Sequence, residues 1–175
     1  MNYINIPGVQ PTLSRLVLGG RFGEQDEVLS FELLDAFVAL GGNAIDTAHS
    51  YANGESESLI GRWLSKRHNR ERIFLIDKGC HPTSQQLKRV TPQCIRSDIH
   101  ESLSRLQTSY IDLYFLHRDD RSVPVGPLLE TLNEEMASGR ILSFGASNWH
   151  RDRLAEATEY AKTHNIVGFC TSSCT

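Results

Sequence analysis

The chain has 175 residues, a formal net charge of −3 at pH 7 and 39% hydrophobic residues, the composition of a globular protein with material for one sizeable core. Its basic residues are scattered, which excludes an electropositive nucleic-acid surface, and no apolar run approaches the ~20 residues of a membrane span. The first ten residues hold neither a charged start nor an apolar run, so we expect no signal peptide, no membrane contact and one domain over 1–175.

Apolar runs that are typical of strands alternate along the chain with segments of helical periodicity. The predicted strands cover residues 16–20, 44–46, 73–78, 110–117, 141–148 and 166–173. The predicted helices cover residues 27–40, 55–66, 91–106, 128–139 and 153–164. The third helix has the clearest signals, because Thr91 suits an N-cap, Pro92 suits the first helical position, and Ile95, Ile99 and Leu103 recur on one face.

This alternation, without a hairpin signal between the elements, predicts right-handed βαβ units and a parallel sheet. The strands are almost continuously apolar, which indicates that both faces of the sheet are covered. Two architectures fit, an open doubly wound sheet and a (β/α)8 barrel. The chain has no GxGxxG after its first strand and no GxxxxGK[ST] anywhere, which weakens the open nucleotide-binding sheet and favours the barrel.

A polar residue stands at the end of each of four successive predicted strands, namely Asp46, Lys78, His117 and Asn148. In a barrel the carboxyl ends of the strands meet at one face, where catalytic residues come from several strands. Tyr51 follows Asp46 on the same strand-to-helix loop. We therefore expect these side chains to share one site.

A phenol, an ammonium, a carboxylate and an imidazole together suit the protonation of a carbonyl oxygen. A phenol is a weak acid, with a reference pKa of about 10, and the Lys78 ammonium would stabilise its anion while Asp46 keeps that lysine charged. His117 would donate a hydrogen bond to the substrate oxygen. No side chain supplies hydride, so a nicotinamide is implied, with Ser147 and Asn148 beside its carboxamide. The alternative is a salt bridge that only stabilises a barrel interior.

Three segments, 42–51, 110–118 and 139–148, resemble motifs of the aldo-keto reductases; they read GNAIDTAHSY, YIDLYFLHR and GRILSFGASN. The resemblance implies NADPH-dependent reduction of an aldehyde or ketone to an alcohol on a barrel fold, with a small-molecule carbonyl substrate. It makes Tyr51 the general acid, assisted by Asp46, Lys78 and His117. It also implies cofactor contacts from five residues, the first two near the nicotinamide ribose: Gly20, Arg21, Asp46, Ser147 and Asn148.

The chain departs from this family in length and at Asp77. A complete barrel usually needs about 250 residues, so we expect an incomplete (β/α)8 barrel of six βα units, without the last two strands and their phosphate-binding loops. An exposed apolar strand edge near 166–170 would then invite self-association. Asp77 is a second candidate partner for the Lys78 ammonium. An inactive remnant, or a non-catalytic binding or regulatory subunit, is the alternative function.

Cysteine and histidine spacings argue against disulfides and metal sites. None of the four cysteines forms a CxxC pair. Cys170 and Cys174 fall on a segment predicted to be extended, where ~3.3 Å per residue separates them by about 13 Å, too far for a disulfide. The seven histidines include no HxH or HExxH. We expect reduced thiols, no bound metal and a cytoplasmic location.

Overall fold

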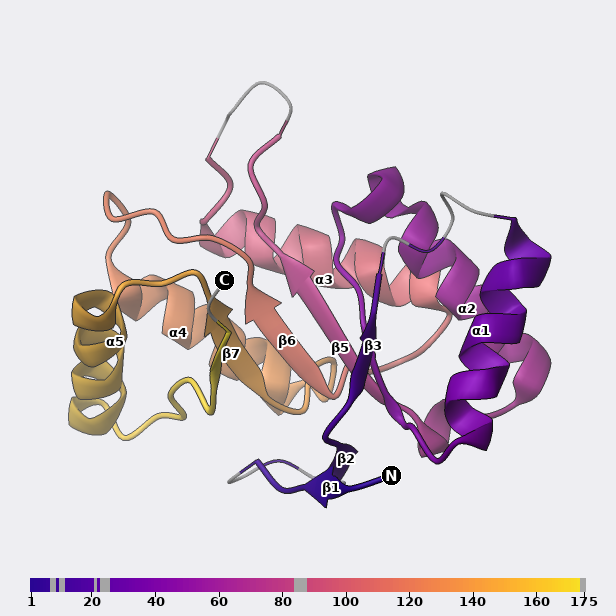
Figure 1. Cartoon of the computed structure of the whole chain (residues 1–175). Coiled ribbons are helices and arrows are strands. Elements are labelled where there is room, and N and C mark those ends of the chain that lie inside the picture. The colour runs from indigo at the N-terminus through magenta and orange to yellow at the C-terminus, as the bar shows by residue number, and fades with distance from the viewer. Residues whose placement is uncertain (7–8, 10–11, 21, 23–25, 84–87, 174–175) are drawn as a thin grey trace.

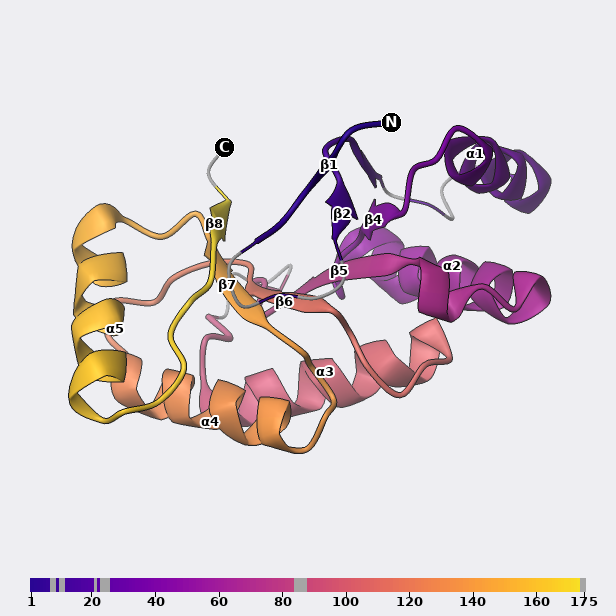
Figure 2. The same ribbon diagram turned by 90° about the horizontal axis from the view of Figure 1, so that it is seen from below.

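A parallel sheet curled into an arc is the framework of the molecule (Figures 1 and 2). The computed structural model describes residues 1–6, 9, 12–20, 22, 26–83 and 88–173. Over these residues the sheet has six strands in chain order: β3 (Val17–Gly19), β4 (Ala44–Asp46), β5 (Phe74–Gly79), β6 (Leu113–Leu116), β7 (Phe144–Ser147) and β8 (Ser172–Ser173). All neighbours are parallel, and the order never reverses as it would in a doubly wound sheet. The predicted incomplete barrel is therefore confirmed.

The longer helices cover the convex outer side of this arc (Figure 2). They are α1 (Glu27–Ala39), α2 (Glu55–Arg67), α3 (Pro92–Leu106), α4 (Val125–Ala137) and α5 (Arg151–Thr163). Two short 3-10 turns, η1 (Tyr51–Gly54) and η2 (Arg70–Arg72), flank α2. The start of α3 is as predicted, since the Thr91 side chain accepts a hydrogen bond from the Cys94 amide at 3.2 Å. Among the described residues, no helix combines the length and apolar character that crossing a bilayer requires.

Strand periodicity divides the core into two layers and decides which polar residues reach the interior of the arc. On β5, Phe74 and Ile76 belong to the inner apolar cluster, whereas Leu75 packs into the larger cluster under the helices. Because side chains alternate along a strand, Lys78 continues the inner row and Asp77 the outer one.

An N-terminal hairpin, which the sequence analysis did not foresee, lies below the amino ends of the strands (Figure 1). Its strands are β1 (Tyr3–Ile4) and β2 (Leu13–Ser14), paired antiparallel. The Ser14 amide donates to Asn43 Oδ1 at 2.7 Å, just before β4 begins. Leu13 and Val9 are buried in the inner cluster, so the hairpin closes the bottom of the arc.

The strand predicted over 166–173 is much shorter in the structure: only Ser172–Ser173 forms strand β8 beside β7, and backbone hydrogen bonds to β7 begin at Cys170. The amide side chain of Asn133 on α4 accepts from the Val167 amide at 3.0 Å and donates to its carbonyl at 2.9 Å. The backbone groups of Val167 are thus satisfied by a side chain and not by a neighbouring strand. The edge of the sheet at β8 is consequently short, polar and exposed.

Candidate active site

The predicted polar residues of β4 and β5 meet on the inner side of the arc, at its carboxyl edge. The Lys78 ammonium forms an ion pair with the Asp46 carboxylate and donates to the Thr47 carbonyl at 2.8 Å. Burial raises the pKa of the Asp46 carboxyl, and this effect exceeds the opposite pull of the Lys78 charge. The lysine side chain is only 8% exposed, so its charge acts in a poorly solvated place.

Tyr51 opens the 3-10 turn that leads from β4 into α2. The Lys78 nitrogen lies 5.1 Å from the centre of its ring, and the His117 ring centre lies 5.8 Å away. Ala52 and Asn53 follow with φ of 49° and 55°, and Gly54 with 89°. Left-handed backbone at two consecutive non-glycine residues is uncommon and costs free energy. The phenol is thus held by a strained loop against the lysine and the imidazole.

His117 follows β6 and is almost fully buried. Burial, helped by the charges of Lys78, His81 and Arg118, lowers the pKa of its imidazole to about 3. The ring is therefore neutral near pH 7, and its Nδ1 atom is buried without a hydrogen-bond partner. A neutral imidazole can donate one hydrogen bond to a substrate oxygen without delivering a full positive charge.

Ser147 and Asn148 lie at the same edge, at the end of β7. The Asn148 amide donates to Ser147 Oγ at 3.0 Å and to the His117 carbonyl at 3.4 Å. Asn148 takes a left-handed φ of 61°, which turns the chain away from the strand. A hydroxyl and an amide at the end of a barrel strand, linked to the backbone of His117, offer the donor and acceptor groups that the carboxamide end of a nicotinamide would need. Among the predicted ribose contacts, Gly20 is partly exposed, and Arg21 lies outside the described residues.

Asp77 is not the partner of the Lys78 ammonium. Both of its carboxylate oxygens are buried without a hydrogen-bond partner, on the outer side of β5. Burial first, and the Glu57 carboxylate second, hold the pKa of Asp77 well above its usual range. The two adjacent residues therefore belong to different layers, and the expected competition for the ammonium does not occur.

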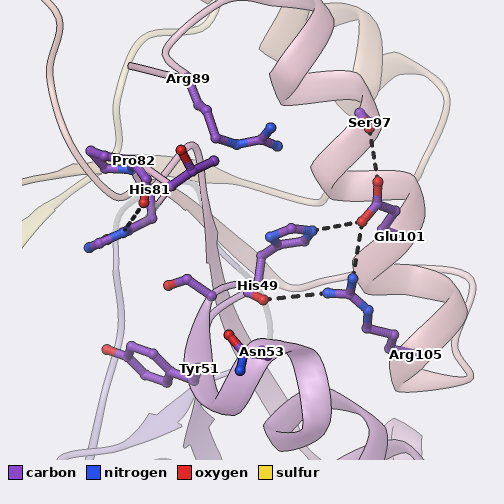
Figure 3. A pocket seen from close by; sticks show the side chains of 11 residues that line it. His49, Tyr51, Asn53, His81, Pro82, Arg89, Ser97, Glu101 and Arg105 are labelled. Atoms are coloured by element: carbon purple, nitrogen blue, oxygen red, sulfur yellow. Dashed lines mark hydrogen bonds and ion pairs between the residues drawn. The ribbon is translucent and has the colours of Figure 1, made fainter. Parts of the chain in front are cut away.

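A cavity of about 790 Å³ opens beside Tyr51, between the ends of β4 and β5 and helix α3 (Figure 3). Its lining is mostly polar, and most of it was missed by sequence reasoning: His49, Ser50, Asn53, His81, Pro82, Thr83, Arg89, Ser97, Glu101 and Arg105. For two of these residues the sequence held a signal in their position, because His49 and His81 each follow the end of a strand within three residues. In the described part of the chain, no group of three or more His, Cys, Asp or Glu is placed to hold a metal.

Comparisons with known proteins give one consistent result. The model of the aldo/keto reductase family matches residues 15–172. Norsolorinic acid reductase B of Aspergillus parasiticus is 36% identical over 159 residues, 86% of this chain and 42% of the relative. An aryl-alcohol dehydrogenase of Pestalotiopsis microspora is 33% identical (93% and 47%), and aryl-alcohol dehydrogenase [NADP(+)] of Phanerodontia chrysosporium is 32% identical (80% and 39%). The chain spans less than half the length of these curated relatives.

Proposed function

The chain belongs to the aldo/keto reductase family, and on this premise we propose that it carries the proton-donating centre of an NADPH-dependent reductase of aldehydes or ketones. The observation that carries the proposal is the meeting of Asp46, Tyr51, Lys78 and His117 at the carboxyl edge of the sheet. Carboxyl ends of parallel barrel strands are where this fold places catalysis.

Each of the four side chains has a distinct role in this proposal. Tyr51 gives its phenolic proton to the carbonyl oxygen as hydride reaches the carbon, and the alcohol leaves with that proton. The Lys78 ammonium, 5.1 Å from the phenol ring centre, stabilises the phenolate that remains. Asp46 fixes the lysine. The neutral His117 donates a hydrogen bond that orients the carbonyl oxygen.

NADPH would supply the hydride. Ser147 and Asn148 would hold its carboxamide, while Asp46, Gly20 and Arg21 would lie near the nicotinamide ribose. The Phanerodontia chrysosporium relative is named for NADP(+), which supports this cofactor over NADH. The free thiols of the described cysteines Cys80, Cys94 and Cys170 agree with a reducing compartment, and we place the protein in the cytoplasm.

We propose aromatic aldehydes as substrates, entering through the cavity beside Tyr51. Two relatives are named aryl-alcohol dehydrogenases. The cavity, at about 790 Å³, lies within the usual range of roughly 300–1,000 Å³ for small-molecule sites.

The proposal is tested by following NADPH consumption by the 175-residue chain with benzaldehyde, at millimolar NADPH, in parallel with NADPH fluorescence. Tyr51→Phe should abolish turnover and leave the dissociation constant of NADPH unchanged, because the phenolic proton is used only in the transition state. The control is Tyr110→Phe, because Tyr110 lies before β6, at the opposite end of the strands. Equal turnover by Tyr51→Phe, or none by the parent chain, would overturn the proposal, and the second result would favour a non-catalytic binding subunit.

A further inference from the structure

We propose that Arg105, on α3, is a positioning residue that holds the tyrosine loop, which we define as residues 47–54. This inference rests on the proposed function, since it gives Arg105 its importance through Tyr51. The arginine belongs to a different βα unit from the loop and lies 48 residues beyond Glu57, its partner on α2. No motif in the sequence pointed to it.

The guanidinium of Arg105 contacts the loop itself and the start of the helix that follows it. Its Nη1 atom donates to the Glu57 carboxylate at 2.9 Å, in the first turn of the helix that the loop enters. The same atom lies 3.4 Å from the His49 carbonyl that accepts from it, just before Tyr51. Between these points the guanidinium packs against Gly54, where a Cβ atom would come within 2.7 Å of it.

Strand β5 holds the loop from the other side. The Thr47 amide donates to the Ile76 carbonyl at 2.9 Å, and the His49 amide donates to the Lys78 carbonyl at 2.8 Å. Lys78 Nζ donates to the Thr47 carbonyl at 2.8 Å. Hydrogen bonds to the strand that carries the lysine therefore hold one side of the loop, and Arg105 holds the other side.

Glu101 links Arg105 to the side chain of His49 in the loop. Its carboxylate accepts from Arg105 at 3.0 Å and from the His49 ring at 3.0 Å, so arginine, glutamate and histidine form one connected set (Figure 3). Charge-assisted hydrogen bonds of this kind are stronger than neutral ones. The Glu57 side chain is fully buried, so loss of the guanidinium would strand a carboxylate there without its partner.

The loop needs such support because its backbone is strained. Ala52 and Asn53 hold left-handed φ, and conformations of this kind persist only where the surroundings over-determine them. In Figure 3 the Tyr51 ring points away from Arg105, so the arginine acts through the loop backbone and not on the phenol itself. Its removal should shift the phenol relative to Lys78, and misplacement by about 1 Å can lower turnover roughly 100-fold.

The test compares Arg105→Met with a matched control, Arg70→Met. Arg70 also binds a buried carboxylate, that of Asp112 at 2.7 Å, and the carbonyls of Ile73 and Tyr110 at 2.8 Å each. It lies at the opposite, amino end of the strands. Each single variant is compared with a double variant in which the carboxylate left without its arginine is also neutralised. The double variants are Arg105→Met with Glu57→Gln and Arg70→Met with Asp112→Asn.

Two measurements are made on each variant, namely amide hydrogen exchange over residues 47–54 and steady-state reduction of benzaldehyde. With its neutralised partner, the Arg105 variant should recover most of its resistance to urea, yet its loop amides should still exchange about tenfold faster, as loss of a hydrogen bond to a charged group implies. Its kcat should fall roughly 100-fold with little change in KM. The two variants of Arg70, with and without Asp112→Asn, should lower resistance to urea. They should leave kcat and the exchange of the loop amides unchanged.

The exchange measurement separates failure of this inference from failure of the proposed function. If the parent chain has no turnover, the proposed function fails, and loop exchange still decides the role of Arg105. If exchange over 47–54 responds equally to the Arg105 and Arg70 variants, Arg105 is only a stabilising residue and the inference is overturned. Full recovery of kcat in the Arg105–Glu57 double variant would overturn it as well.

Discussion

The Lys78 ammonium and the Asp46 carboxylate form an ion pair across neighbouring strands, yet burial still raises the pKa of the carboxyl. The lysine is the more enclosed partner, with 8% of its side chain exposed against 24% for the aspartate. The cation of this pair is held out of water in the place where a tyrosine ring and an imidazole face it.

Replacing Lys78 by Met should lower kcat at least about 100-fold, the lower end of what acid–base groups contribute. The phenolate of Tyr51 would lose the cation that stabilises it. Stopped-flow measurement of NADPH oxidation at saturating substrate checks this. Lys162→Met, at an exposed position of α5, is the control and should keep the parental rate. A rate within twofold of the parent for Lys78→Met would contradict the assigned role.

His117 should remain neutral well below the pH at which a free imidazole is protonated. Its pKa is about 3 in the folded chain, against an ordinary value of 6.5 for an imidazole. Between these values the unfolded chain binds the proton and the folded chain does not, so stability falls as pH drops from 6.5 towards 3, by at most about 1.4 kcal/mol per unit. His117→Gln should remove this part of the acid sensitivity in urea unfolding at pH 7 and pH 5. An NMR signal of the His117 ring that titrates near pH 6.5 would contradict the expectation.

Asp77→Asn should gain stability relative to the parent as pH rises. The folded-state pKa of Asp77 is raised, so its protonated form stabilises the fold at low pH and that contribution is lost as pH rises through the folded pKa. Asparagine removes the titration. Urea unfolding at pH 5, 7 and 9 should show the difference between variant and parent growing with pH. The exposed Asp152→Asn should show a constant difference over this range, and a constant difference for Asp77→Asn would refute the prediction.

Gly61→Ala should destabilise the chain by about 1–3 kcal/mol, the usual cost of overpacking. A Cβ atom at Gly61 would lie 2.2 Å from the Arg105 carbonyl, so α2 and α3 would have to move apart. Urea unfolding measures this cost, with the exposed Ser65→Ala on the same helix as the control. Equal stability of both variants would show that the two helices can separate without loss.

Self-association should occur through β3 and not through the segment first expected. Leu16 and Val17 are 66% and 42% exposed at this edge of the sheet, and the adjacent α1 exposes Leu29 and Leu33. We propose that chains pair there, and Leu16→Lys should weaken the pairing because charged edge residues oppose it. Sedimentation velocity at rising concentration checks this. A monodisperse parent chain at every concentration would rule it out.

Regular patterns explain what the sequence could predict. Asp46, Lys78 and His117 were found because each follows an apolar strand, and parallel strands bring such ends to one edge. Tyr51 and Asn148 were found through position and resemblance together. Their convergence at that edge is now described, whereas their catalytic and cofactor roles stay predictions.

Long-range packing explains what the sequence could not predict. Arg105 reaches Glu57 because α2 and α3 approach closely at Gly61, and no local pattern encodes that approach. The hairpin escaped notice because each of its strands has only two residues. The apolar residues from Ile166 fit a strand pattern, but periodicity cannot show that Asn133 binds the backbone of Val167.

The hairpin below the sheet has a consequence for synthesis of the chain. Leu13 is buried in the same cluster as Phe115, although 102 residues separate them (115 − 13). At the usual 5–20 residues per second, the ribosome makes the second partner roughly 5–20 s after the first. During this interval the hairpin can pack only against the cluster residues already made, Ala44, Phe74 and Ile76, so part of its apolar surface stays open to chaperones and proteases. The nascent chain should therefore become protease-resistant only after β6 has emerged.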